Sequence, residues 1–160
     1  RRMRGEKTQL LEVSDIDEDQ TENFEIDYEI IEAMFFAYRD FVSDPDLVLK
    51  EFKFGRAHHR IIHFVSRQPG LTVAELLDIL NITKQSLAKV LKQLIQTGFI
   101  KQETDHEDRR QRHLYTTQKG QKLALKLSKQ QSRRISLALK EMAPEDRNTI
   151  LSFLNGMHNK

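Results

Sequence analysis

The stretch Asp105-His106-Glu107-Asp108-Arg109-Arg110-Gln111-Arg112 decides how the rest of this chain is interpreted. Two short strand-like runs, 99–104 and 113–116, flank these charged residues. Polar residues between two such runs predict the tip of a β-hairpin. A charged octet alone would be an ordinary solvated loop, so its meaning depends on the sequence around it.

A helix-turn-helix pattern lies directly before this hairpin. Thr72, with Glu75 three residues later, has the arrangement of a capping box and predicts the start of a short helix. After a tight turn, Thr83 predicts the cap of a second helix, and Gly98 predicts its end. A basic-tipped hairpin that follows two such helices is typical of a wing. The pattern therefore predicts a winged helix-turn-helix that binds duplex DNA.

Helical patterns also flank this unit on both sides. Apolar residues at helical spacing predict one helix over 24–42, which Ser43-Asp44-Pro45-Asp46 should end, and another over 55–67. Thr117 predicts the cap of a long helix to about Met142, and a last helix follows. We expect a mainly α fold with a small two- or three-stranded β-wing, in the order α-α-α-α-β-β-α-α.

Charge is distributed unevenly along the chain, although the formal net charge is only +2. Residues 1–48 carry five Lys and Arg against fourteen Asp and Glu, whereas 84–134 carry thirteen basic residues against four acidic ones. A basic block of this kind favours a polyanion-binding surface, and the polar, acidic residues 1–23 predict a mobile tail. The chain has no cysteine, which excludes disulfides and thiolate metal sites. We expect a cytoplasmic protein with no membrane segment.

The second helix of the helix-turn-helix carries side chains suited to reading DNA. Its apolar stripe would be buried, which leaves Lys and Gln facing outward with no acidic residue between Lys84 and Ile100. Lys bonds to phosphate or guanine, Gln can bond to adenine, and Arg suits the minor groove. The alternative is an ordinary amphipathic helix. The expected DNA contacts are Thr83, Lys84, Gln85, Ser86, Lys89, Lys92, Gln93, Arg109, Arg110 and Arg112.

These motifs resemble the MarR family of bacterial winged-helix regulators over about 26–157. The matching stretches are Gly70-Leu71-Thr72-Val73-Ala74-Glu75-Leu76, Ile82-Thr83-Lys84-Gln85-Ser86-Leu87, Gly98-Phe99-Ile100, Asp105-x-x-Asp108-Arg109-Arg110 and Tyr115-Thr116-Thr117-x-Lys119-Gly120. The resemblance implies that Arg109 or Arg110 enters the minor groove and that the other wing arginine pairs with Asp105 or Asp108. It also implies repression that is relieved by a small ligand.

A homodimer is expected from the resemblance and from packing. The long flanking helices cannot all cover a winged-helix core of about seventy residues, so a partner chain should cover their apolar faces. The chain would then comprise an acidic tail over 1–23, a dimerisation helix and connection over 24–54, a winged helix-turn-helix lobe over 55–117 and dimerisation helices over 118–160. The expected interface residues are Phe24, Ile26, Ile135, Leu139, Ile150, Phe153 and Leu154. Such a dimer should bind a pseudo-palindrome with half-sites about 10 bp apart.

Family ligands usually bind between the dimerisation helices and the winged-helix lobe. The residues expected there are Met34, Tyr38, His59, Ile62, His63 and Phe64, which suit a small aromatic or phenolic effector. Ordinary core packing is the alternative for these residues. His59 and His63, four residues apart, also raise a zinc site, but no acidic residue recurs beside them, so we expect neither metal nor cofactor.

The sequence thus predicts a ligand-responsive transcription regulator, and two other functions remain open. A winged-helix module could bind proteins without DNA affinity, or the chain could be an architectural DNA binder without an effector. A regulator typically prefers its operator by ~10³-fold or more, which separates it from the architectural binder. No nucleophile–base arrangement or phosphate-binding glycine loop is present, so we do not expect an enzyme.

Overall fold

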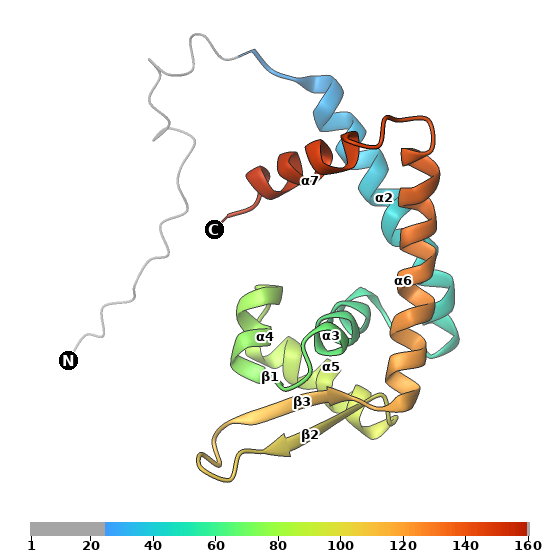
Figure 1. Cartoon of the computed structure of the whole chain (residues 1–160). Helices are drawn as coiled ribbons and strands as arrows, with labels where there is room; N and C mark the ends of the chain where they lie inside the picture. The colour runs from blue at the N-terminus through green and yellow to red at the C-terminus, as the bar shows by residue number, and fades with distance from the viewer. Residues whose placement is uncertain (1–24, 160) are drawn as a thin grey trace, which may run out of the picture. The chain divides into compact units, whose positions relative to one another are not determined.

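The computed structural model describes residues 25–159 of the chain. Phe24 and the predicted tail over 1–23 lie outside the described residues. Within this range, six helices and three short strands confirm the predicted mainly α fold with a β-wing. In the order of Figure 1 they are α2 (Tyr28–Glu51), α3 (Arg56–Arg67), β1 (Leu71–Thr72), α4 (Val73–Leu80), α5 (Lys84–Gln96), β2 (Ile100–Thr104), β3 (Arg112–Thr116), α6 (Gln118–Leu139) and α7 (Asp146–Met157).

The three strands form one antiparallel sheet in the order β1-β3-β2. Strands β2 and β3 are the arms of the predicted hairpin, and Thr104 pairs with Arg112 where the arms lead into the tip. The two-residue strand β1 pairs Leu71 with Leu114 on the other edge of β3. Leu114 is fully buried, so the central strand ties the wing to the helical lobe.

The hydrophobic core lies between α3, α4, α5, the first half of α6 and the sheet. Burying each large aliphatic side chain stabilises the fold by about 1.5–3 kcal/mol. In the described chain, no core residue follows Leu127. The core comprises Val48, Leu49, Ile61, Ile62, Val65, Leu71, Leu76, Leu80, Leu87, Leu91, Leu94, Phe99, Ile100, Leu114, Leu123, Ala124 and Leu127.

Helix α2 corrects one expectation, because Ser43-Asp44-Pro45-Asp46 does not end it and the helix continues to Glu51. A proline inside a helix removes a backbone hydrogen bond and costs about 3 kcal/mol. Here Pro45, Val48 and Leu49 are all buried. Burial of the turns around and after the proline therefore offsets its helix-breaking tendency, which the sequence pattern did not indicate.

The start of α6 packs tightly against the turn that follows α5. Thr117 caps α6 by accepting the Gly120 N–H at 3.1 Å. Lys119 Nζ donates to the Thr97 carbonyl oxygen at 2.9 Å and lies 4.3 Å from the centroid of the Phe99 ring. A Cβ atom on Gly120 would lie only 2.1 Å from the Phe99 carbonyl oxygen. Glycine at this position is therefore required for the approach of α6 to the α5–β2 turn.

The chain divides into two compact units after Phe36. The first is described over 25–36 and exposes apolar side chains, among them Ile26 and Phe35, which are 54% and 72% exposed. The second unit contains the rest of α2 and all the other elements. Within the range that the structure describes, no helix is both long and apolar enough to cross a lipid bilayer.

Candidate nucleic-acid interface

Helix α5 is held in the lobe by one apolar face, and its start is fixed by a local cap. Leu87, Leu91 and Leu94 are buried and lie along one side of the helix. Thr83 Oγ1 accepts the Ser86 N–H at 3.1 Å, and the two hydroxyl oxygens are 2.9 Å apart. The cap therefore fixes where α5 begins. It also bonds Thr83 and Ser86, two of the predicted DNA contacts, to each other.

The opposite face of α5 is exposed and carries only positive charge. Lys84, Lys89 and Lys92 lie on this face, and the helix contains no acidic residue. The other predicted contacts on this helix, Gln85, Ser86 and Gln93, are exposed as well. A cationic helix face with amide side chains can contact both phosphates and the edges of bases.

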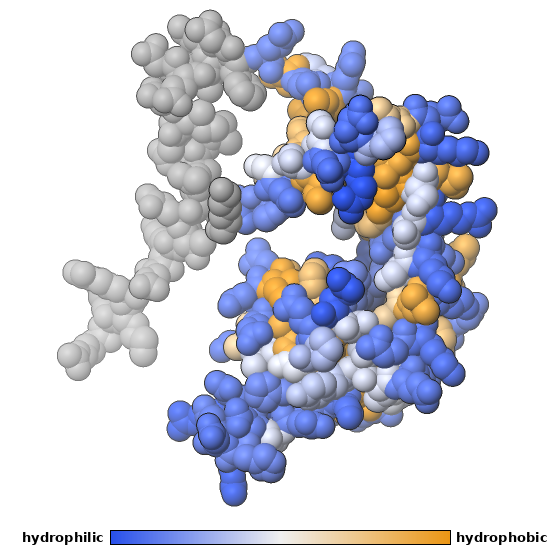
Figure 2. Space-filling model, viewed as in Figure 1, coloured by the Kyte–Doolittle hydropathy of each residue, from blue (hydrophilic) through white to orange (hydrophobic). Residues whose placement is uncertain are grey.

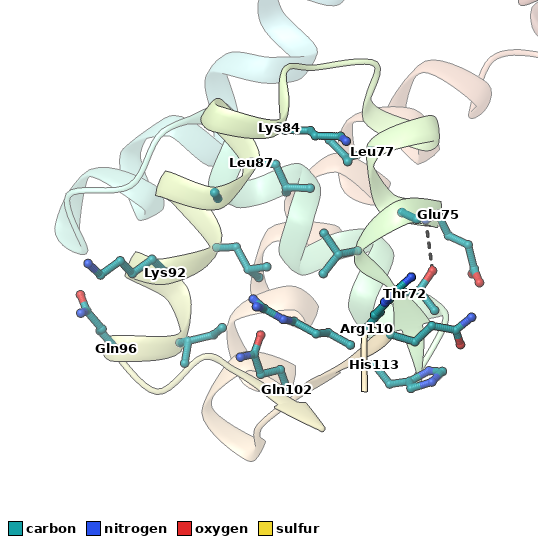
Figure 3. Close-up of a pocket in the computed structure, with 17 residues that line it drawn as sticks. Thr72, Glu75, Leu77, Lys84, Leu87, Lys92, Gln96, Gln102, Arg110 and His113 are labelled. Atoms are coloured by element: carbon teal, nitrogen blue, oxygen red, sulfur yellow. Dashed lines mark hydrogen bonds between the residues drawn. The ribbon is translucent and has the colours of Figure 1, made fainter. Parts of the chain in front are cut away.

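A groove of about 1190 Å³ separates α5 from the wing. Its walls are apolar side chains of α4 and α5, which include Leu77, Leu87 and Leu91. Cationic side chains come from both sides: Lys84 and Lys92 from α5, and Arg110 and Arg112 from the hairpin. Figure 3 shows Lys84 and Lys92 along α5, across the groove from Arg110 and His113. Sequence reasoning identified these cations separately, but it did not place them around one groove.

The wing tip is a tight turn that places Arg109 and Arg110 at its corner. The Gln111 N–H donates to the Asp108 carbonyl oxygen at 3.0 Å, which closes a β-turn around the two arginines. Asp108 Oδ1 also accepts the Arg110 N–H at 3.0 Å. All residues from His106 to Arg112 are exposed, and Figure 2 shows the hydrophilic tip at the lower left. The turn therefore presents both arginines to solvent.

The wing aspartates do not pair with arginines, which corrects the expected Asp–Arg pair. Asp108 bonds to a backbone N–H instead, and Asp105 Oδ1 accepts the Glu107 N–H at 2.9 Å. Within 25–159, neither carboxylate forms an ion pair with a wing arginine. Aspartates in turns bond readily to nearby backbone N–H groups. Their use in the turn leaves the guanidinium groups free to contact phosphate.

His113 anchors the base of the wing, a role that the sequence did not reveal. Its Nδ1 lies 2.9 Å from the Gly70 carbonyl oxygen and its Nε2 lies 3.4 Å from Asp105 Oδ2. The bond to Gly70 and the bond to Asp105 together raise the pKa of His113 above its ordinary value. The Glu107 N–H, followed by His113, lowers the pKa of Asp105. His113 therefore ties the hairpin to the turn before β1, and its bond to Asp105 favours the charged form of the imidazole.

The predicted ligand residues differ widely in how far the described chain buries them. Ile62 is fully buried in the core, whereas Tyr38 is 63% exposed. His59 and His63 are half-buried on α3, and burial lowers the pKa of each. The His63 ring contacts Phe64 edge-on, with centroids 5.1 Å apart.

Met34 belongs to the first unit, whereas the other predicted ligand residues belong to the second. The groove beside α5 and a second cavity, lined by Ser43, Asp44, Asp46, Leu47, Lys50 and Phe54, contain none of the predicted ligand residues. No group of three or more metal-ligating side chains forms among the described residues. The effector pocket therefore stays a prediction.

The predicted interface residues on α6 and α7 lie largely at the surface. Ile135, Phe153 and Leu154 are 49%, 45% and 46% exposed, and Leu139 and Ile150 are partly buried. No residue of α7 is buried by the described part of the chain. An apolar surface of this extent is unusual for a helix that has no partner.

A model of the MarR family matches residues 53–111. The chain is 49% identical over 115 residues to the HTH-type transcriptional regulator PetP of Rhodobacter capsulatus, and this alignment covers 72% of the chain and 69% of PetP. The matched family region includes the helix-turn-helix and most of the wing.

Solved structures share the fold at lower identity. A MarR-family regulator of Listeria monocytogenes complexed with 26mer DNA has a TM-score of 0.70 at 20% identity, covering 79% of this chain and 84% of that one. Streptococcus pneumoniae FabT in complex with DNA has a TM-score of 0.69 at 18% identity, covering 81% and 92%. Identities of 18% and 20% show a shared fold alone, whereas 49% identity to PetP over 72% of the chain shows a shared family. The chain belongs to the MarR family of transcriptional regulators.

Proposed function

We propose that this transcription regulator acts as a homodimer on a pseudo-palindromic DNA operator and represses transcription until a small effector releases it. The proposal rests mainly on the cationic groove, where Lys84 and Lys92 face Arg110 and Arg112. The exposed face of α5 would enter the major groove of DNA, and the wing tip would reach the adjacent minor groove. The phosphate backbone between the two DNA grooves would lie over the cationic groove of the protein.

The proposed DNA contacts divide into two chemical groups. Lys89 and Gln85 lie on the exposed face of α5 and suit bonds to bases or phosphates. Arg109, Arg110 and Arg112 lie on the wing, where they would add sequence-independent affinity. The complexes with DNA formed by the Listeria and Streptococcus relatives support this assignment for a shared fold.

The homodimer is supported by the apolar face that α6 and α7 leave uncovered. Burying apolar surface contributes about 25 cal/mol per Å², which would favour covering this face with the same face of a second chain. A two-fold dimer would also repeat α5, and two copies of α5 about one helical turn of DNA apart would read both halves of a pseudo-palindrome. The described residues that we assign to this interface are Ile26, Ile135, Leu139, Ile150, Phe153 and Leu154.

The effector is proposed to be a small aromatic or phenolic molecule that binds near α3. His59 and His63 lie one helical turn apart and are half-buried. Burial keeps them neutral near pH 7, since it lowers the pKa of both. A neutral imidazole can both donate and accept a hydrogen bond, which suits a phenol or an aromatic acid. Tyr38, Ile62 and Phe64 complete the proposed site.

The test is to select binding sites from a pool of random duplexes with the purified full-length chain. Binding of the selected duplex and of a random duplex is then measured by fluorescence anisotropy at several salt concentrations. We expect an inverted-repeat site and an affinity ratio of ~10³ or more. Equal affinity for both duplexes would contradict a sequence-specific regulator and would indicate an architectural DNA binder. No binding at low salt would favour a protein-interaction module.

A further inference from the structure

His58 is a buried polar residue that the DNA-binding surface described above does not use. It is only 9% exposed and is the one polar side chain of the buried set in the described chain. Its ring stacks on Phe54 with centroids 4.6 Å apart and an interplanar angle of 10°. It forms two hydrogen bonds, one with Gly55 at the start of α3 and one with Gln93 of α5. A buried histidine with both ring nitrogens bonded is held in a single orientation.

The first bond fixes which ring nitrogen carries the proton. The Gly55 N–H donates to His58 Nδ1 at 3.0 Å, and a backbone N–H can only donate. Nδ1 must therefore be the unprotonated nitrogen, which leaves the proton on Nε2. His58 Nε2 lies 2.7 Å from Gln93 Oε1, so the imidazole donates to the amide oxygen. The tautomer and the amide orientation follow from this one chain of bonds.

The second bond changes the role expected of Gln93. Reading adenine with Gln requires the amide oxygen and the amide nitrogen together, because adenine offers one donor and one acceptor in the major groove. In Gln93 the oxygen already accepts from His58. One of the two lone pairs of this oxygen is therefore engaged and the amide is held toward α3, in contrast to Gln85 on the exposed face of the same helix.

We propose that His58 and Gln93 are positioning residues, which set the orientation of α5 on the lobe instead of contacting bases. This inference rests on the proposed function, because it concerns how the same DNA-binding helix is held. The hydrophobic contacts of α5 are non-directional, so they do not by themselves fix its rotation on the lobe. The His58–Gln93 bond adds a directional contact between α3 and the exposed side of α5.

The same contact joins α5 to the end of α2. Phe54 follows α2 and stacks on His58, and it also meets Phe99 edge-on with centroids 5.2 Å apart. Phe99 lies just after the turn that ends α5 and is nearly fully buried. A displacement of the end of α2 would therefore reach α5 at two points, through Gln93 and through Phe99. This cluster therefore links the end of α2 to α5 through packed rings and one hydrogen bond.

A double-mutant cycle tests the positioning role. His58→Phe keeps a ring against Phe54 and removes both hydrogen bonds, and Gln93→Met keeps the length of the side chain without its amide. We expect each variant to lower the affinity for the duplex selected by the wild type by about tenfold. The double variant should be no weaker than the weaker single variant, within about threefold. Affinity for a random duplex should change less than threefold in all of them.

Gln85→Met is the matched control on the same helix. Combined with His58→Phe, it should give additive losses, because Gln85 lies on the face proposed to contact DNA and makes no contact with His58. Additive losses for His58→Phe and Gln93→Met would overturn the proposal. So would a single base-pair change in the selected duplex that fully compensates Gln93→Met, since that would make Gln93 a base-reading residue.

A measurement without DNA keeps the inference independent of the proposed function. Nitrogen-15 NMR of the wild-type imidazoles should show His58 as the Nε2–H tautomer, with an Nε2–H proton protected from exchange. In Gln93→Met this protection should be lost and the amide resonances of α5 should shift. If the wild type selects no duplex, the proposed function fails, while these spectra still decide whether the link exists. An Nδ1–H tautomer or unshifted α5 resonances would overturn the inference.

Discussion

The two halves of α6 use similar residues and meet opposite environments. In the first half, Leu123, Ala124 and Leu127 are buried against the winged-helix lobe. In the second half, Ile135 and Leu137 are 49% and 60% exposed. Both halves carry apolar side chains at helical spacing, so periodicity alone does not distinguish them. What distinguishes them is whether this chain itself supplies the surface that covers them.

This difference separates the part of the molecule whose apolar residues are covered within one chain from the part whose apolar residues are left exposed. The lobe has a closed core and exposes the polar surface that we propose contacts DNA. The second half of α6 and all of α7 present an apolar surface, which we propose a second chain covers.

Placing a charge on the uncovered face should have the largest effect. Leu154→Glu should convert a dimer to a monomer, because a carboxylate would have to be buried in an apolar interface. Affinity for the selected duplex should fall by at least about 100-fold, since the two half-sites would no longer be bound together. Light scattering after size-exclusion chromatography measures the mass. Leu125→Glu, at a leucine that is 56% exposed on the first half of α6, should remain dimeric. A dimeric Leu154→Glu variant would contradict the assigned interface.

Adding one methyl group at the start of α6 should damage the closed lobe. Gly120→Ala places a Cβ atom 2.1 Å from the Phe99 carbonyl oxygen, and the backbone must shift to relieve the clash. We expect the free energy of unfolding to fall by about 3 kcal/mol in urea titrations. Gly156→Ala is the matched control, because a Cβ atom there meets nothing within 4 Å. That control should be neutral or gain up to about 1 kcal/mol. Equal stability of the two variants would show that the close approach is not real.

Removing the wing arginines should weaken DNA binding without affecting the fold. Arg109→Ala and Arg110→Ala should each lower the affinity for selected and random duplexes by about tenfold, and each should reduce the slope of log affinity against log salt by about 1. Arg133→Ala, an exposed arginine on α6, removes the same charge away from the wing and should have a smaller effect. If Arg133→Ala matches the wing variants, total charge and not wing geometry determines the affinity.

A change of pH should have the smallest effect, and it should act through the base of the wing. Since the bonds to Gly70 and Asp105 raise the pKa of His113, its charged form stabilises the wing below the ordinary value of 6.5 and that contribution is lost as pH rises through the raised value. Duplex affinity should therefore decrease a few-fold as pH rises above about 6.5. His113→Asn should flatten this dependence, whereas His106→Asn at the tip should keep it. An unchanged pH dependence in His113→Asn would show that His113 does not cause the pH dependence of DNA binding.

Local capping signals predicted most of the lobe correctly. Thr72, Thr83 and Thr117 each accept the backbone N–H three residues later, as the caps required. The end of α2 was predicted wrongly, since the helix continues past Pro45. Sequence periodicity describes a helix in isolation, and here the burial of residues after the proline decided the outcome. Tertiary packing of that kind has no local signature.

The site was predictable in its charges and less so in its geometry. The positive face of α5 and the wing arginines follow directly from the order of residues. The contacts of His58 and His113 join residues 35 and 43 positions apart, to Gln93 and Gly70, and no motif marks them. The wing aspartates were expected to pair with arginines, but they bond to the backbone of the turn and to His113. Such bonds depend on how the turn closes.

The most direct test of the central claim is the stoichiometry and salt dependence of DNA binding by the wild-type chain. We expect two chains per selected duplex and a steep fall in affinity with salt, with a slope near −0.9 for each phosphate contacted. The preference over random duplex should remain at moderate salt. A single chain per duplex, or an affinity that does not depend on salt, would show that the chain does not bind DNA as a dimer through this cationic surface.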